Sequence, residues 1–136
     1  LNIFFGWLTF AIAAIVYLLT IEPTASFWDC GEFIATAYKM EVGHPPGAPF
    51  FMLLGRFFTL FAGQAENAAM MMNGMSALAS AFTILFLFWT VTHLGRKMLI
   101  REEKDYNPAN ILVILGSAFI GALAYTFSDT FSNSPL

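Results

Sequence analysis

Residues 26–47 read SFWDCGEFIATAYKMEVGHPPG and bring several side chains capable of acid–base chemistry into one short stretch. Asp29 and Glu32 stand three residues apart, so both carboxylates face the same side if this stretch is helical. Partial desolvation beside Phe27 and Trp28 raises the basicity of a carboxylate, and a positioned base takes the proton of an attacking hydroxyl. The spacing therefore makes Asp29 and Glu32 the candidate catalytic residues.

A structural role explains the same spacing. Ser26, Asp29 and Glu32 follow the three-residue steps of a capping box, so Asp29 is also suited to accept hydrogen bonds where a helix begins. The capping and catalytic roles do not exclude each other, and both stay open. Cys30 is the single cysteine, and no His or Cys cluster at metal-ligand spacing accompanies it. The sequence therefore predicts neither a disulfide framework nor a metal site.

Four further residues are candidates for substrate binding. Lys39 falls on the face of the two carboxylates. His44 lies just before a predicted helix start, where free N–H groups favour an anion such as phosphate, and Arg56 offers that anion a planar fork of donors. The alternatives are a turn residue packed on prolines for His44 and a side chain that snorkels to the membrane surface for Arg56. Asn73 faces either a substrate cavity or a neighbouring helix.

Two short helices are predicted to position these groups. The first is an amphipathic helix over residues 29–40 that lies along the membrane face. Its apolar side carries Cys30, Phe33, Ile34, Ala37 and Tyr38, and its wet side carries Asp29, Glu32, Thr36 and Lys39. The second begins near Pro49 and is too short to span a bilayer upright, which takes roughly 20 residues. It is predicted to be interfacial or re-entrant.

Three segments, residues 3–21, 68–94 and 109–128, are long and apolar enough to cross a bilayer as helices. Glu22-Pro23 closes the first, Gly95-Arg96-Lys97 closes the second, and Asn107-Pro108 opens the third. A cleaved signal peptide is the alternative for residues 3–21, since EPTAS supplies small residues after the apolar run. The sequence thus predicts an all-α, polytopic membrane protein fragment with three transmembrane helices and a long helical loop between the first two.

Composition and charge support this topology. Hydrophobic residues make up 58% of the 136 residues and charged residues 11%, with a mean hydropathy of +0.69, which indicates a membrane protein and not a nucleic-acid-binding surface. Four of the six Lys and Arg residues fall between the second and third spans. The positive-inside rule therefore predicts a cytoplasmic loop over residues 95–108, an external loop over residues 22–67 and a cytoplasmic N-terminus.

Small residues recur every fourth position in the second and third spans. The rows are Ser76-x-x-x-Ser80, Ala77-x-x-x-Ala81, Ser117-x-x-x-Gly121 and Ala118-x-x-x-Ala122. Such rows allow membrane helices to approach closely, so they predict bundle contacts and not a cofactor site.

The order of these parts resembles the start of the GT-C superfamily of membrane glycosyltransferases. Those enzymes begin with one span, an external loop with an acidic motif, a Pro-Pro, an aromatic juxtamembrane helix and a second span rich in small residues. The matching positions here are Asp29 and Glu32, His44-Pro45-Pro46, residues 50–61 and residues 67–94. More closely, TIEPTASFWDCGEF and YKMEVGHPPGAPFFML resemble a bacterial membrane family, formerly of unknown function, whose eukaryotic relative is a protein O-mannosyltransferase.

That resemblance covers nearly the whole chain and has two departures. Gly31 stands where members often have proline, and residues 132–136 replace an aromatic, acidic stretch. The second departure predicts a truncated or frame-disrupted C-terminus, so this chain alone is expected to be incomplete and inactive.

The resemblance implies a transfer of a sugar, mannose being expected, from a polyprenyl phosphate to a Ser or Thr hydroxyl of an acceptor protein, with inversion. Asp29 would be the general base and Glu32 would orient it or the acceptor. His44 and Arg56 would stabilise the leaving phosphate. No obligatory metal is expected, with a divalent ion at Asp29 as the alternative. The expected location is the bilayer of a bacterial inner membrane, with the catalytic loop periplasmic.

Another class of function fits the same features. Three spans with packing motifs also suit a non-catalytic structural or assembly subunit, in which Asp29 caps a helix and Arg56 anchors to lipid. A transporter half would need polar groups at mid-membrane in broken helices, and these spans carry few.

Overall fold

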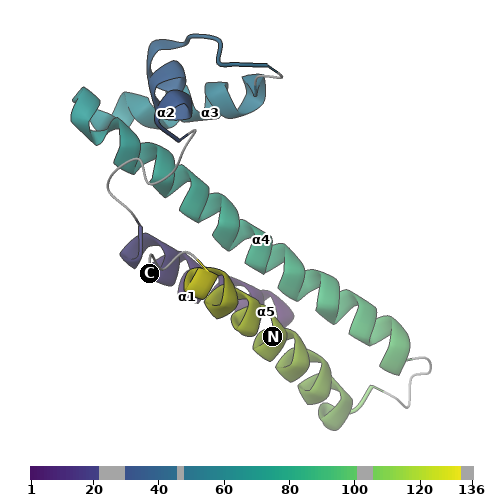
Figure 1. The fold of residues 1–136 in the computed structure, drawn as a ribbon. Coiled ribbons are helices and arrows are strands. Elements are labelled where there is room, and N and C mark those ends of the chain that lie inside the picture. Colours follow the sequence, from purple (N-terminus) through teal and green to yellow (C-terminus); the bar gives the residue numbers. More distant parts are fainter. Residues whose placement is uncertain (22–29, 46–47, 101–105, 133–136) are drawn as a thin grey trace. The chain divides into compact units, whose positions relative to one another are not determined.

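The computed structural model describes residues 1–21, 30–45, 48–100 and 106–132, with the backbone alone for residues 129–132. Every regular element within these ranges is helical. The helices are α1 (Asn2–Leu19), α2 (Cys30–Lys39), α3 (Pro49–Thr59), the short 3-10 helices η1 (Leu60–Ala62) and η2 (Ala65–Asn67), α4 (Ala68–Leu99) and α5 (Pro108–Ser132) (Figure 1). Three of them, α1, α4 and α5, are long and apolar enough to cross a membrane. The predicted all-α class with three spans is confirmed.

The chain divides into two compact units, Leu1–Leu19 with Ala79–Leu136 and Thr20–Leu78. The first unit holds α1, α5 and residues 79–99 of α4, and the second holds α2, α3 and residues 68–78 of α4. The candidate site belongs to the second unit.

Small residues form the centre of the first unit. Ala13 and Ala14 of α1, Ala81 of α4, and Ala118 and Ala122 of α5 are buried together around Ile84 and Phe88. Small side chains there let the helices pack closely, as predicted for Ala81, Ala118 and Ala122. The serine–glycine row behaves differently. Ser117 donates its hydroxyl to the Ile114 carbonyl of its own helix, and a Cβ on Gly121 would meet no atom within 4 Å.

The end of α4 corrects one prediction. Gly95-Arg96-Lys97 does not close the helix, because α4 continues to Leu99. A Cβ on Gly95 would lie 3.3 Å from Ile114 of α5, so this glycine permits a close helix contact. Arg96 and Lys97 lie in the last turn, where cations interact favourably with the helix dipole.

In the second unit, α2 and α3 pack together against the start of α4. Ala37, Met72 and Met75 are buried there, with Ile34, Phe51, Met52 and Phe58 packed against them. The helix α3 begins at Pro49 as predicted. It exposes Phe50 and Phe57, and η1 directly after it exposes Phe61, as expected of a short helical segment at a membrane surface.

Gly55 sits where α2, α3 and α4 cross, and its replacement by alanine is expected to destabilise the second unit. The added Cβ would lie 2.7 Å from Cε of Met72 and 3.0 Å from Cβ of Ala37. Overpacking of this kind costs about 1–3 kcal/mol, measured as a lower thermal midpoint of the full-length protein in detergent. Gly31→Ala is the matched control, because a Cβ there meets nothing within 4 Å. Equal midpoints for the two variants would contradict the crossing at Gly55.

Candidate functional site

The helix α2 turns its apolar side inward, as its periodicity predicts. Ala37 is buried, whereas Glu32 and Lys39 are exposed. Thr36 corrects the predicted wet face, since it is buried at 8% exposure. Its hydroxyl donates to the Glu32 carbonyl at 2.7 Å, so a helical threonine satisfies its polar group within its own turn. Because a threonine side chain carries both a methyl group and a hydroxyl group, its sequence position alone does not decide whether it faces the core or the solvent.

The end of α2 reverses the chain. Met40 adopts a positive φ of 59°, the left-handed conformation that commonly ends helices. The Glu41 N–H then donates to the Thr36 carbonyl at 2.9 Å and the Met40 N–H to the Ala37 carbonyl at 3.4 Å, the two bonds of a Schellman motif. The segment after α2 therefore runs back along the helix, toward its first turn.

This reversal delivers His44 to Glu32. One carboxylate oxygen, Oε1, accepts the backbone N–H of His44 at 2.8 Å, and the other, Oε2, lies 2.8 Å from ring atom Nδ1. A Cβ on Gly43 would lie 3.1 Å from Oε1, so the absence of a side chain there leaves room for the carboxylate. The His44 ring also stands edge-on to Phe33, with centroids 6.3 Å apart. We call Glu32 and His44 the loop clamp.

The loop clamp changes the acidity of its carboxyl group. The backbone N–H of His44, followed by its ring, holds the pKa of Glu32 below the ordinary value of 4.5, because hydrogen bonds stabilise the charged form. Glu32 is thus a carboxylate at neutral pH, and its two oxygens contact the backbone N–H and the ring Nδ1 of His44. The clamp therefore offers an exposed acid–base pair, with side-chain exposures of 53% for His44 and 40% for Glu32.

An apolar cavity lies on the inner side of the same elements. Its volume is about 360 Å³, and Phe33 links it to the loop clamp because this ring lines the cavity and contacts His44. The remaining lining residues are Cys30, Ile34, Ala48, Phe51, Met72, Asn73 and Ser76. Asn73 is therefore at a cavity, one of the two positions predicted for it. Sequence reasoning missed Phe33 and Phe51 as cavity residues, although the apolar face of the predicted helix was the signal.

Arg56 contacts both the backbone and the ring of Tyr38. Its Nη1 donates to the Tyr38 carbonyl, and its guanidinium carbon lies 5.7 Å from the centroid of the Tyr38 ring. The side chain thus places a cation at the C-terminal turn of α2, where the helix dipole favours it. The bond to Tyr38 uses one of the five N–H groups of the guanidinium. Lys39, the last residue of α2, is exposed. The structure therefore joins Glu32 and His44 but assigns Arg56 to Tyr38.

The roles predicted for Asp29 and for a metal ion stay predictions. Asp29 lies outside the described residues, as does Pro46 of the double proline, so the capping and catalytic roles of Asp29 both stay predictions. The helix α2 begins at the next residue, Cys30. Within the described ranges, no group of three His, Cys, Asp or Glu side chains is arranged to hold a metal ion, and the expectation of no obligatory metal stays a prediction.

Comparison with known proteins identifies a family and two similar relatives. Residues 29–135 match the family described as "Protein O-mannosyl-transferase TMEM260 N-terminal domain". The chain is 33% identical over 85 residues to protein O-mannosyl-transferase tmem260 of Dictyostelium discoideum, covering 62% of this chain and 10% of that protein. It is 37% identical over 87 residues to protein O-mannosyl-transferase TMEM260 of Mus musculus, covering 63% and 12%. No solved structure matches. The chain spans about a tenth of the length of these curated relatives.

Proposed function

This chain belongs to the TMEM260 N-terminal domain family, and from that premise we propose that it is the N-terminal membrane part of a GT-C-type glycosyltransferase. The complete protein transfers a sugar, mannose by the names of the relatives, to Ser or Thr hydroxyls of acceptor proteins. The sugar comes from a polyprenyl phosphate in the bilayer.

One observation supports a polyprenyl phosphate as the sugar donor. A polyprenyl phosphate joins a charged group to an apolar chain, so its site must offer polar donors beside an apolar surface. The loop clamp and the 360 Å³ cavity meet at Phe33 and provide both within one unit of the chain. His44, held in place by Glu32, donates a hydrogen bond to the leaving phosphate and stabilises the charge that develops on it. The first isoprene units occupy the cavity, whose apolar lining favours them.

The proposed reaction is a single displacement. The acceptor hydroxyl oxygen attacks the anomeric carbon, the bond from that carbon to the phosphate oxygen breaks, and polyprenyl phosphate leaves. Asp29, next to the first residue of α2, takes the hydroxyl proton as general base. Glu32 fixes His44, while Lys39 and the remaining donors of Arg56 add positive charge near the departing phosphate. Asn73 positions the donor from the cavity.

The proposed orientation follows the charge asymmetry. The basic segment after α4 faces the cytoplasm, so residues 22–67 and the reaction lie on the external side. For a bacterial host this is the periplasmic side of the inner membrane. Apolar helices of this length support an integral membrane protein, whatever its source.

The donor class is tested by incubating the full-length protein in vesicles with mannose carried on a polyprenyl phosphate or on a nucleotide. A peptide rich in Ser and Thr is the acceptor, and incorporated sugar is measured by mass spectrometry. Transfer is expected from the lipid donor alone. Transfer from the nucleotide sugar would contradict the proposed donor. Transfer from neither, with an intact fold, would favour a structural or assembly subunit.

A further inference from the structure

A second cavity lies in the other unit of the chain, at the basic end of α4. Its volume is about 560 Å³, within the range of small-molecule sites. Most of the lining side chains stand at helical spacing along one face of α4, and Asn2 of α1 completes the lining. The residues from α4 are Trp89, Thr92, His93, Arg96 and Lys97, and Ile100 directly follows the helix. The Ile100 N–H donates to the Arg96 carbonyl, so this stripe continues one helical face past the last residue of α4.

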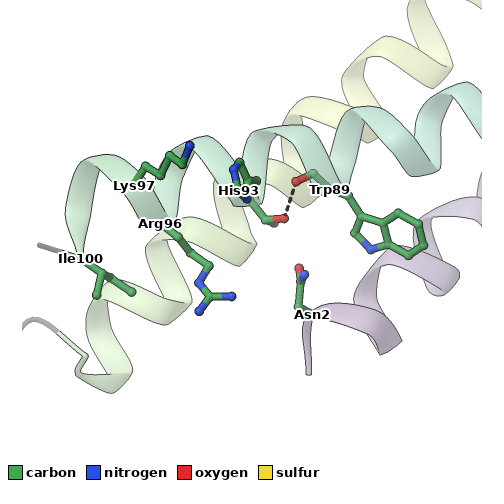
Figure 2. A pocket seen from close by; sticks show the side chains of 7 residues that line it. Asn2, Trp89, His93, Arg96, Lys97 and Ile100 are labelled. Atoms are coloured by element: carbon green, nitrogen blue, oxygen red, sulfur yellow. Dashed lines mark hydrogen bonds between the residues drawn. The ribbon is translucent and has the colours of Figure 1, made fainter. Parts of the chain in front are cut away.

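The charge of the cavity has one sign. Arg96 and Lys97 are basic side chains, and His93 adds an imidazole beside them. Figure 2 shows Arg96 and Asn2 pointing from α4 and α1 toward the same space. Among the described residues, nothing provides a hydrogen-bond partner for the buried Oδ1 of Asn2. The cavity therefore combines basic side chains that can bind an anion with a neutral amide oxygen that can accept a hydrogen bond from a ligand.

Apolar surface surrounds this basic cavity. Leu94 and Met98, on the same turns of α4, are exposed at 53% and 73%. Trp89 lies at the inner edge of the cavity, and tryptophan is enriched where membrane spans meet water. The acyl chains of a lipid whose headgroup lies in the cavity would contact these apolar side chains, whereas a soluble anion would not.

From this placement we propose that the end of α4 binds the headgroup of an anionic phospholipid. Arg96 and Lys97 contact the phosphate, with His93 beside them, and Asn2 bonds a hydroxyl of the headgroup. Basic pockets at the ends of membrane helices suit such headgroups. This site differs from the sugar-donor site in position and in ligand, and it does not depend on the proposed transfer.

The test uses native mass spectrometry of the full-length protein titrated with phosphatidylglycerol or with phosphatidylcholine of the same acyl chains. Wild type is expected to prefer phosphatidylglycerol. Each basic residue near a membrane surface contributes about fivefold in affinity, so Arg96→Gln with Lys97→Gln is expected to weaken phosphatidylglycerol binding about 25-fold. Arg101→Gln with Lys104→Gln is the matched control, since it removes the same charge from the segment that follows α4 and leaves the described residues that line the cavity unchanged, and it is expected to retain binding.

Four results would count against the proposal. Equal binding of the two lipids would exclude an anionic site, and equal loss in the two double variants would assign the preference to general loop charge. Binding of soluble glycerol phosphate without binding of the lipid would assign the cavity to a soluble anion. Asn2→Ala keeps every charge and is expected to weaken binding about fivefold through one lost hydrogen bond. Unchanged binding in that variant would also count against the site.

Discussion

The Asp29→Asn substitution in the full-length protein is expected to lower the rate of sugar transfer by about 10²–10⁴-fold, the contribution typical of a general base. Asparagine is nearly the same size and still accepts hydrogen bonds as a helix cap, but it cannot take a proton. The measurement is the single-turnover rate of transfer to a Ser- or Thr-containing peptide, with thermal midpoints compared in parallel.

Glu41→Gln is the matched control for this experiment. Glu41 is an exposed carboxylate that follows α2, and its loss removes the same charge from the same loop. It is expected to transfer sugar at the wild-type rate. If Asp29→Asn kept the wild-type rate with an intact fold, Asp29 would be a cap and no base.

Breaking the loop clamp is expected to give the second large effect. Glu32→Ala removes both acceptors that hold His44, and a misplacement near 1 Å at a reacting centre costs about 10²-fold in rate. His44→Ala is expected to cause a similar loss. Because the two residues act as one unit, the double variant should lose little more than either single variant. Fully additive losses in transfer rate would contradict the clamp.

The same pair sets a dependence on pH. The pKa of Glu32 is lower in the folded protein than its ordinary 4.5, so the carboxylate stabilises the fold above that value. This stabilisation is lost as the pH falls from 4.5 through the lower folded pKa. The difference in thermal midpoint between wild type and Glu32→Gln should therefore shrink as the pH falls through this window and disappear below it. A difference that grows on acidification would reverse the sign and refute the assignment.

Sequence periodicity predicted the elements well because membrane spans and amphipathic helices depend on local patterns. The start of α3 at Pro49 and the alanine contacts at Ala81 and Ala118 needed no knowledge of partners. The predicted end of α4 was wrong. Glycine commonly ends a helix, but Gly95 instead permits a close contact with Ile114 of α5, which local sequence does not reveal.

The candidate site was only partly predictable. Glu32 and His44 were each identified, but their pairing depends on the left-handed Met40, a residue type that gives no turn signal. Arg56 donates to the Tyr38 carbonyl, a contact that the sequence could not indicate, because neither composition nor periodicity reveals which backbone groups a side chain meets. Its role at a phosphate stays a prediction. Contacts across a chain reversal are set by the geometry of the turn, and composition does not encode them.

The central claim, a single displacement assisted by a loop carboxylate, is tested most directly by the anomeric configuration of the transferred sugar. The full-length protein would be given a polyprenyl-phosphate sugar of defined configuration, and the glycopeptide product would be examined by NMR. The account predicts the configuration opposite to that of the donor, because one displacement inverts the anomeric carbon. A product with the configuration of the donor would require a covalent sugar–enzyme intermediate and would contradict the account.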